Sequence, residues 1–353
     1  MVTAAPTLPT RHVELFLSEA GATKTAVPAR DAIPVVALRA GALEQTRNPC
    51  KVGPGFCTNR QQAMANLPRL KPDPIPQPHP VPEFLAEGEL KARYEDMKAV
   101  LGVPWMGVVT MSFAHYRAFY DALWQGARPL CASRDFTDAC HRLRHLVEEK
   151  VSALGPPPLR QRLAQIGYAK RELQDIDESI EIFSDGNFPY ILLATLARLL
   201  LEGGELQTSH AIAIQTEPTS PRTAGKLVLM EYHHADASTR RVFDDVKAVL
   251  GLPFLNTDYR ALARWPSYFA LAWADLRPKL QRAEYETLVA EIHEAAVSIV
   301  RSLPNYGNLR GEALRLAARG SGSEGEVLSV VRLFQWLLPG LAVNIAFFRA
   351  QLR

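Results

Sequence analysis

The chain has 353 residues, of which 47% are apolar, and it carries a formal net charge of only +3. This length allows two domains of ordinary size, and the apolar fraction allows a substantial core. The small, dispersed charge argues against a nucleic-acid partner. No apolar stretch approaches the ~20 residues that span a bilayer, so we expect no membrane partner either.

Residues 1–82 form a Pro-rich N-terminal extension, which we expect to be mostly irregular because each proline disfavours helix around it. It contains no apolar stretch beside basic residues of the kind that marks a secretory signal. Met64 lies within it, and a start there would leave 290 residues. Residues 1–63 are therefore expected to be an optional extension or the product of a mis-assigned start.

The cysteines predict neither a metal centre nor a redox pair. Cys50, Cys57, Cys131 and Cys140 form no C-x-x-C pair and match no zinc-binding spacing. We therefore expect free thiols, no metal site and a reducing, cytoplasmic location.

From residue 83 onward the hydrophobic spacing predicts helices and scarcely any strand, so the predicted class is all-α. The stretch "FPYILLATLARLLLEGG", residues 188–204, predicts a helix that begins near Pro189 and stops at a glycine pair, after an earlier helix that ends at "SDGN". Two further long helices are predicted over residues 283–303 and 325–352.

The sequence also contains an internal repeat. "YEDMKAVLGVP", residues 94–104, and "FDDVKAVLGLP", residues 243–253, are identical at seven of eleven positions, with an offset of 149 residues. The same offset continues without a gap through Trp124 and Trp273. We therefore predict two helical repeats over residues 83–215 and 231–353, joined by a linker over 216–230. A unit present only twice favours an intramolecular pseudo-dimer over a solenoid.

Polar residues that differ between the two copies are the better candidates for chemistry, because residues that both copies share mostly serve the fold. At the offset of 149, Gly107 aligns with Asn256 and Val109 with Asp258. Asn187 has a leucine opposite it in the second copy. If the two copies pack face to face, the carboxylate of Asp258 and the amide of Asn187 can meet between them.

Helix capping is the competing interpretation of these residues. Asp258 or Thr257 is a natural N-cap for the helix predicted over "YRALAR", and Asn187 for the helix predicted over "FPYILL". An N-cap lies beside the exposed N–H groups of a helix start, which also bind anions. Residue type alone leaves both interpretations open.

Four stretches together resemble the group I 2-haloacid dehalogenases, a family that acts on D- or on both D- and L-2-haloacids. They are "LGVPWMGV", "FSDGNFPYILLATL", "LPFLNTDYRALARWPSYF" and "LFQWLLPGLAVN", in this order along the tandem repeat. The resemblance covers the sequence from about residue 83 to its end. It implies an all-helical pseudo-dimer with the active site between the halves and a 2-haloacid and water as the reacting partners.

The resemblance assigns roles to three residues. Asp258 matches the family's catalytic aspartate, and Asn187 matches the asparagine that helps to hold the attacking water. Asn256 matches the position associated with stereochemistry, where D-specific members carry Asn. The resemblance thus implies a D-2-haloacid dehalogenase.

Two positions depart from the family pattern. Asp185 replaces an aromatic residue close to the site, since the family's "YGN" reads "DGN" here. A Thr-x-x-x-Glu pair of some members reads Ser133 and Thr137, so these two residues are at most supporting.

The residues suggest how such a reaction would proceed. Asp258 would take a proton from water as general base, a contribution of ~10²–10⁴-fold, while Asn187 would orient that water. No covalent ester, metal or organic cofactor is required. The hydroxyl of Thr257 and nearby helix N–H groups are expected to bind the substrate carboxylate. Four residues are candidates for the apolar wall around the alkyl group and the halogen: Trp105, Val108, Phe334 and Leu338. Each of them can also be interpreted as an ordinary core residue.

Two other functions remain open alternatives from the sequence. A non-catalytic helical scaffold would keep the repeat without the chemistry and release no halide. A helical redox enzyme of the alkylhydroperoxidase-D-like kind would need a C-x-x-C dithiol, which this sequence lacks. We also expect the whole protein to form a homodimer.

Overall fold

The computed structural model describes residues 67–209, 213–215 and 227–353. All of them belong to one compact unit, Arg60–Arg353. Met64, Cys50, Cys57 and most of the predicted extension over residues 1–82 lie outside the described residues, as do most of the linker residues 216–230.

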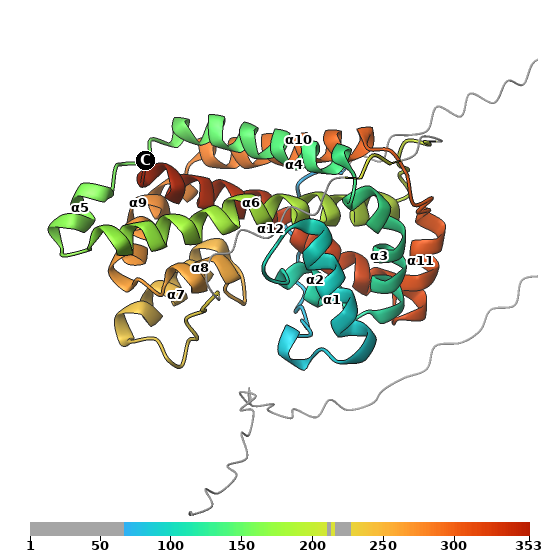
Figure 1. Cartoon of the computed structure of the whole chain (residues 1–353), viewed down its shortest axis with the longest axis horizontal. Helices are drawn as coiled ribbons and strands as arrows, with labels where there is room; N and C mark the ends of the chain where they lie inside the picture. Colours follow the sequence, from blue (N-terminus) through green and yellow to red (C-terminus); the bar gives the residue numbers. More distant parts are fainter. Residues whose placement is uncertain (1–66, 210–212, 216–226) are drawn as a thin grey trace, which may run out of the picture. The chain divides into compact units, whose positions relative to one another are not determined.

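The described part of the protein is mostly helical, which confirms the predicted all-α class (Figure 1). The α-helices are α1 (Gly88–Leu101), α2 (Val108–Phe113), α3 (Arg117–Cys131), α4 (Arg134–Lys150), α5 (Arg160–Gln165), α6 (Lys170–Leu201), α7 (Ala237–Leu250), α8 (Thr257–Leu262), α9 (Pro266–Leu280), α10 (Ala283–Ser302), α11 (Gly311–Gly320) and α12 (Glu324–Gln351). Two short 3₁₀ helices, η1 (Glu83–Leu85) and η2 (Val151–Leu154), complete them. Extended pairing in the described ranges is limited to two isolated bridges.

The offset of the sequence repeat reappears in the helix boundaries. Both ends of α1, α2 and α3 differ by 149 residues from the corresponding ends of α7, α8 and α9. α1 and α7 each end at a glycine with positive φ, Gly102 at 65° and Gly251 at 60°. Each glycine N–H bonds back to the last helical turn, which is a conformation that glycine adopts without strain.

The same offset relates two partly buried polar contacts that join the first and third helix of each set. The indole of Trp124 donates to Asp96 at 2.8 Å, and the indole of Trp273 donates to Asp245 at 2.7 Å. Arginines one turn further along α3 and α9 bind the same carboxylates. Residues that both copies share therefore hold the first helix of each set against the third, as expected of residues that serve the fold.

Two long helices, α6 and α12, form the most extensive helix–helix contact and run side by side through the described unit (Figure 1). The short helices pack across the copies, because α8 contacts α6 and α2 contacts α12. By length and composition α12 is apolar enough to cross a membrane, which corrects the expectation that no stretch approaches that length. The structure accounts for its apolarity, since 89% of that apolar window is buried against neighbouring helices.

α6 differs from the prediction of two helices separated near Asn187. It runs unbroken from Lys170 to Leu201, with Asn187 and Pro189 in its interior. A proline inside a helix removes one backbone hydrogen bond, and sequence reasoning treats that as a start signal. Here both flanks of Pro189 are buried, so tertiary packing outweighs the local preference.

Residues Leu67–Lys71, which we call the strap, lie against α6, α10 and α12 without regular secondary structure. Its backbone carbonyls bind buried side chains. Arg198 donates to the carbonyl of Pro68 at 3.0 Å, and the imidazole of His293 lies 2.7 Å from the carbonyl of Leu67. Gln335 links the two, at 2.5 Å from Arg198 and 3.0 Å from His293. The strap is therefore anchored in the core.

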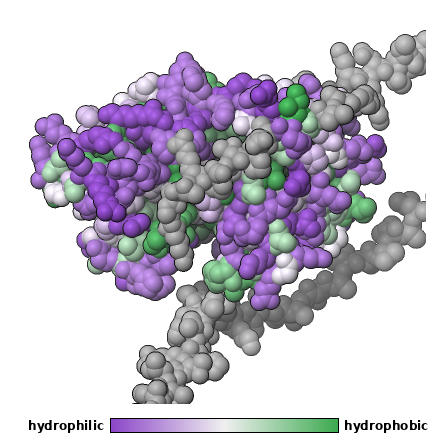
Figure 2. Space-filling model, in the orientation of Figure 1, coloured by the Kyte–Doolittle hydropathy of each residue, from purple (hydrophilic) through white to green (hydrophobic). Residues whose placement is uncertain are grey.

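One face of the described unit is mainly hydrophilic. Figure 2 shows a face on which apolar residues are scattered in small groups among hydrophilic ones. The most exposed large apolar side chain is Phe84 of η1, with an exposed fraction of 84%.

Candidate active site

The structure brings together the two polar residues that distinguish the copies. The side-chain amide of Asn187 donates to Asp258 Oδ1 at 2.7 Å. Asn187 lies in the middle of α6 and Asp258 in the first turn of α8, so the contact joins the two predicted repeats. Both side chains are buried, with exposed fractions of only 3%. A carboxylate and an amide thus form a hydrogen-bonded pair in the interior.

The capping interpretation is wrong for all three residues to which it applied. α8 begins at Thr257, and its N-cap is Asn256, which makes no side-chain capping bond. Asp258 lies within the helix and points to Asn187. Asn187 is itself far from either end of α6. The Asp258 carboxylate and the Asn187 amide are therefore available for a role other than capping.

Burial raises the pKa of the Asp258 carboxyl from its ordinary value of 3.8 to about 6, because the charged form loses its hydration. The hydrogen bond from Asn187 opposes this shift, since it stabilises the carboxylate. A base whose pKa lies near 6 is still ionised at neutral pH and accepts a proton more readily than an ordinary aspartate.

Trp105 packs against α6 close to Asn187. Its ring lies 5.0 Å from that of Phe183 and 6.0 Å from that of Tyr190. The Tyr190 hydroxyl donates to the Trp105 carbonyl at 2.7 Å. The approach depends on Gly186, where a Cβ would lie 2.3 Å from the indole.

The other candidates for the apolar wall lie on α2 and α12. Phe334 is fully buried and packs edge-on to Phe113 of α2, with ring centroids 6.1 Å apart. Leu338, one turn further along α12, is also buried. Val108 is the first residue of α2 and is half-buried. These residues occupy core positions, and their contact with a substrate remains a prediction.

Thr257 and Asn256 are both buried at the start of α8. Asn256 also lines a groove of about 90 Å³ between α8, α10 and α12. Asn344, which lines the same groove, donates to the hydroxyl of Tyr259 at 2.9 Å and accepts from Tyr285 at 2.8 Å. This chain of buried polar groups was not predicted, although an asparagine inside the apolar run "GLAVNIAFF" was a signal for it.

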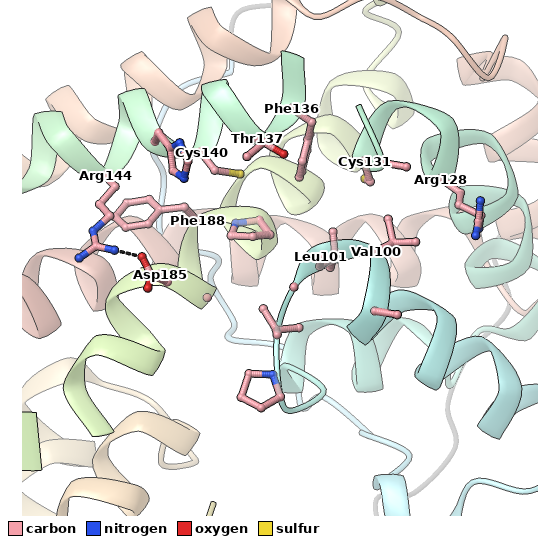
Figure 3. A pocket seen from close by; sticks show the side chains of 18 of the residues that line it. Val100, Leu101, Arg128, Cys131, Phe136, Thr137, Cys140, Arg144, Asp185 and Phe188 are labelled. Atoms are coloured by element: carbon pink, nitrogen blue, oxygen red, sulfur yellow. Dashed lines mark ion pairs between the residues drawn. The ribbon is translucent and has the colours of Figure 1, made fainter. Parts of the chain in front are cut away.

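A cavity of about 520 Å³ is a cleft among residues of the first predicted repeat, and Asp258 and Asn187 do not line it. Figure 3 shows this cleft between α4, α6 and the loop after α1. Asp185 lies on its rim in an ion pair with Arg144. The aromatic residue that the resemblance implies at this position is thus replaced by a charged group facing the cleft.

Ser133 and Thr137 are structural in their contacts. Ser133 is the N-cap of α4, where its hydroxyl accepts from the Phe136 N–H at 3.3 Å. The Thr137 hydroxyl donates back to the Ser133 carbonyl at 3.3 Å, and Thr137 lines the first-repeat cleft. The hydrogen bonds recorded for these two side chains stay within α4 and the residues just before it.

Cys131 and Cys140 are free and buried, and burial raises the pKa of both thiols. Within residues 67–209, 213–215 and 227–353, no group of three or more His, Cys, Asp and Glu side chains is arranged to hold a metal ion.

Comparison with known proteins identifies close relatives. No protein-family model matches the sequence. An "(R)-2-haloacid dehalogenase" of Rhizobium sp. (strain NHG3) is 48% identical over 260 residues, which cover 73% of this chain and 100% of the relative. An "(R)-2-haloacid dehalogenase" of Pseudomonas putida is 35% identical over 77% of this chain and 92% of the relative. A "2-haloacid dehalogenase, configuration-inverting" of Alcaligenes xylosoxydans xylosoxydans is 23% identical over 73% of this chain and 88% of the relative.

Solved structures agree with these relatives. A D-2-haloacid dehalogenase in complex with L-LA superimposes with a TM-score of 0.72 at 32% identity, over 78% of this chain and 96% of that one. A mutant D-2-haloacid dehalogenase in complex with D-2-CPA matches with the same TM-score at 31% identity and over the same shares of both chains.

Proposed function

This chain belongs to the family of (R)-2-haloacid dehalogenases, and on that premise we propose that it hydrolyses short 2-haloalkanoic acids of the D configuration to 2-hydroxy acids with inversion. The observation that carries the proposal is the buried hydrogen bond between Asn187 and Asp258, at 2.7 Å. This hydrogen bond connects two polar residues that have apolar counterparts in the other copy.

Asp258 acts as the general base. A water oxygen forms a bond to the carbon next to the substrate carboxylate while the carbon–halogen bond breaks. The water proton passes to the Asp258 carboxylate, and the halogen leaves with the bonding electrons as halide. The raised pKa of the Asp258 carboxyl supports this role, because a more basic carboxylate takes a proton more readily.

Asn187 holds the water in line for attack. Its amide has two donor hydrogens and an acceptor oxygen, so it can bind Asp258 and still orient a water molecule. Asn187 lies in the interior of an unbroken helix, far from either end of α6. This position fixes its backbone and so supports the role.

The substrate is held by groups around this pair. The Thr257 hydroxyl and N–H groups at the start of α8 bind the carboxylate. Four side chains surround the alkyl group and halogen: Trp105, Val108, Phe334 and Leu338. Asn256 discriminates between enantiomers by filling the volume that the substituent of the L-isomer would need. Ser133 and Thr137 contribute only by supporting α4.

Inversion is supported by relatives rather than by this chain alone. Two of the curated relatives are described as configuration-inverting. D-2-haloacid dehalogenases have also been crystallised with D-2-CPA and with L-LA, a pair of opposite configuration. Attack of water from the side opposite the halogen inverts the configuration at that carbon.

The architecture is part of the same proposal. Residues 83–215 and 231–353 form a tandem duplication that folds as an intramolecular pseudo-dimer, joined by residues 216–230. The 149-residue offset of helix boundaries and the cross-packing of α2 on α12 and α8 on α6 support it. A cytoplasmic location, supported by the two free thiols, and assembly into a homodimer complete the proposal.

The decisive experiment incubates the full-length protein separately with D- and L-2-chloropropionate and measures chloride release and the chirality of the lactate. We expect chloride from the D-isomer and L-lactate as product. Asp258→Asn should lose ~10²–10⁴-fold in kcat, whereas Asp244→Asn, an exposed change on α7, should not. A wild-type protein that releases no halide would favour the helical scaffold.

A further inference from the structure

The two repeats carry equivalent grooves of very different size. The groove beside α8 has about 90 Å³ and the first-repeat cleft about 520 Å³. Several of their wall positions correspond at the offset of 149. In the second repeat these are Val249, Leu250, Leu252, Leu280, Tyr285 and Glu286, which match Val100, Leu101, Val103, Cys131, Phe136 and Thr137.

Only the smaller groove reaches the short helix of its own repeat. Asn256 and Tyr259, on either side of Asp258 in the sequence, form part of its lining. The first-repeat cleft stops at Pro104 and includes no residue of α2. The ring of Tyr190 packs against the start of α2, so close to Gly107 that a Cβ there would be 2.9 Å from it.

In α6, Tyr190 directly follows the internal proline, and in α12 the residue after the internal proline is Gly340. Gly340 lines the smaller groove and carries no side chain into it, and a Cβ there would lie 3.2 Å from the Tyr285 hydroxyl. The large cleft reaches Gly186 and Phe188, on either side of Asn187 in the sequence, but no residue of α2 or α8, whereas the small groove is lined by residues at the start of α8. Neither lining includes Asn187 or Asp258, and the small groove is the one of the two that reaches α8, the helix that carries Asp258.

The strap supplies positive charge beside this groove, because Arg69 is part of the lining. The Arg69 guanidinium lies 5.5 Å from the centroid of the Trp336 ring, donates to the Trp336 carbonyl at 3.3 Å and pairs with Glu286 at 2.6 Å. Lys71 lies over the same ring at 5.4 Å. Around Trp336, which also lines the groove, two cations thus face one carboxylate, so the local charge is positive.

We propose that the groove between α8, α10 and α12 is the access path for the carboxylate substrate and that Arg69 of the strap attracts the anion into it. This inference rests on the proposed function. A positive charge beside an apolar groove raises the local concentration of anions, and the effect weakens as salt screens it. Arg69 is a steering residue and takes no part in the chemical step.

The test compares kcat and kcat/KM for D-2-chloropropionate at low and high ionic strength, about 20 mM and about 500 mM. Arg69→Gln should lower kcat/KM about three- to tenfold at low salt, leave kcat within about twofold and approach wild type at high salt. Arg69→Lys keeps the charge and should restore the salt dependence. Arg128→Gln removes a cation from the large first-repeat cleft and should change neither constant.

Three outcomes would overturn the proposal. Arg69→Gln could match wild type in kcat/KM at low salt. Arg128→Gln could show the larger loss, which would make the first-repeat cleft the route. Arg69→Lys could lose as much as Arg69→Gln together with a lower melting temperature, which would make Arg69 an anchor of the strap. A wild-type protein without chloride release would instead overturn the proposed function itself.

Discussion

The amide of Asn187 and the carboxylate of Asp258 are 71 positions apart in the sequence and 2.7 Å apart in space. Neither side chain is exposed, and each belongs to a different one of the two predicted repeats. The pair accounts for why one copy carries the acid and the other the amide. A carboxylate needs a donor when it is buried, and here the donor comes from the opposite copy.

The raised pKa of Asp258 predicts the pH dependence of catalysis. The base must be ionised, so kcat/KM should rise about tenfold per pH unit below pH 6 and level off above it. Initial rates of chloride release between pH 4.5 and 8.5 would measure this profile. A rate that stays flat down to pH 4.5 would contradict a buried base, provided that circular dichroism shows the protein folded throughout.

The same carboxyl should make the enzyme less stable as the pH rises. The folded-state pKa of about 6 lies above the ordinary value of 3.8, so the folded protein binds the proton more tightly than the unfolded chain. The free energy of unfolding should therefore fall between about pH 4 and pH 6, by about 3 kcal/mol in total. Asp258→Asn has no such proton to lose and should be more stable than wild type at pH 8 but not at pH 4.

Urea unfolding of both proteins at pH 4, 6 and 8 would measure this difference. Asp244→Asn on α7 is the matched control. The pKa of the Asp244 carboxyl is lowered, mainly by its bond to Lys247, so this variant should gain no stability at high pH. An Asp258→Asn variant that is less stable than wild type at pH 8 would show that the buried charge is better compensated than we infer.

Gly186→Ala should displace Trp105. The added Cβ would lie 2.3 Å from the indole inside a packed helix interface. We expect a loss of about 1–3 kcal/mol in unfolding free energy and a raised KM, because Trp105 is assigned to the substrate wall. Gly325→Ala in the first turn of α12 meets no heavy atom within 4 Å and should be neutral or slightly stabilising. Equal stability of the two variants would argue against tight packing at Gly186.

Asn256→Ala should admit L-2-chloropropionate. The shorter side chain opens the start of α8 toward the groove that Asn256 now lines. Chloride release from the separate enantiomers would give the ratio of kcat/KM values, which should move toward unity. An unchanged preference for the D-isomer would remove Asn256 from the specificity assignment.

Long periodic segments were predictable from the sequence. The helices expected over residues 283–303 and 325–352 correspond to α10 and α12 within one residue at each end. Their apolar spacing extends over many turns, so packing and local preference agree. Asp258 and Asn187 were found because they are the polar exceptions in a repeated pattern.

Other features had weaker signals. The proline at position 189 predicted a helix start, but burial on all sides kept α6 continuous. The strap was expected to be irregular. Its contacts were not predicted, because the sequence does not show which backbone carbonyls accept hydrogen bonds from side chains. The lone arginine in "LLATLARLLL", Arg198, was a hint that something polar must meet it in the core.

The packing of α8 on α6 has a consequence for how this protein gains activity during folding. Asn187 and Asp258 lie on different helices that are far apart in the sequence, so the formation of local helices does not by itself bring them together. Turnover begins only after distant parts of the polypeptide have docked. Enzyme assays during refolding would thus measure the rate of the last assembly step. Circular dichroism would separately measure the rate at which the helices form.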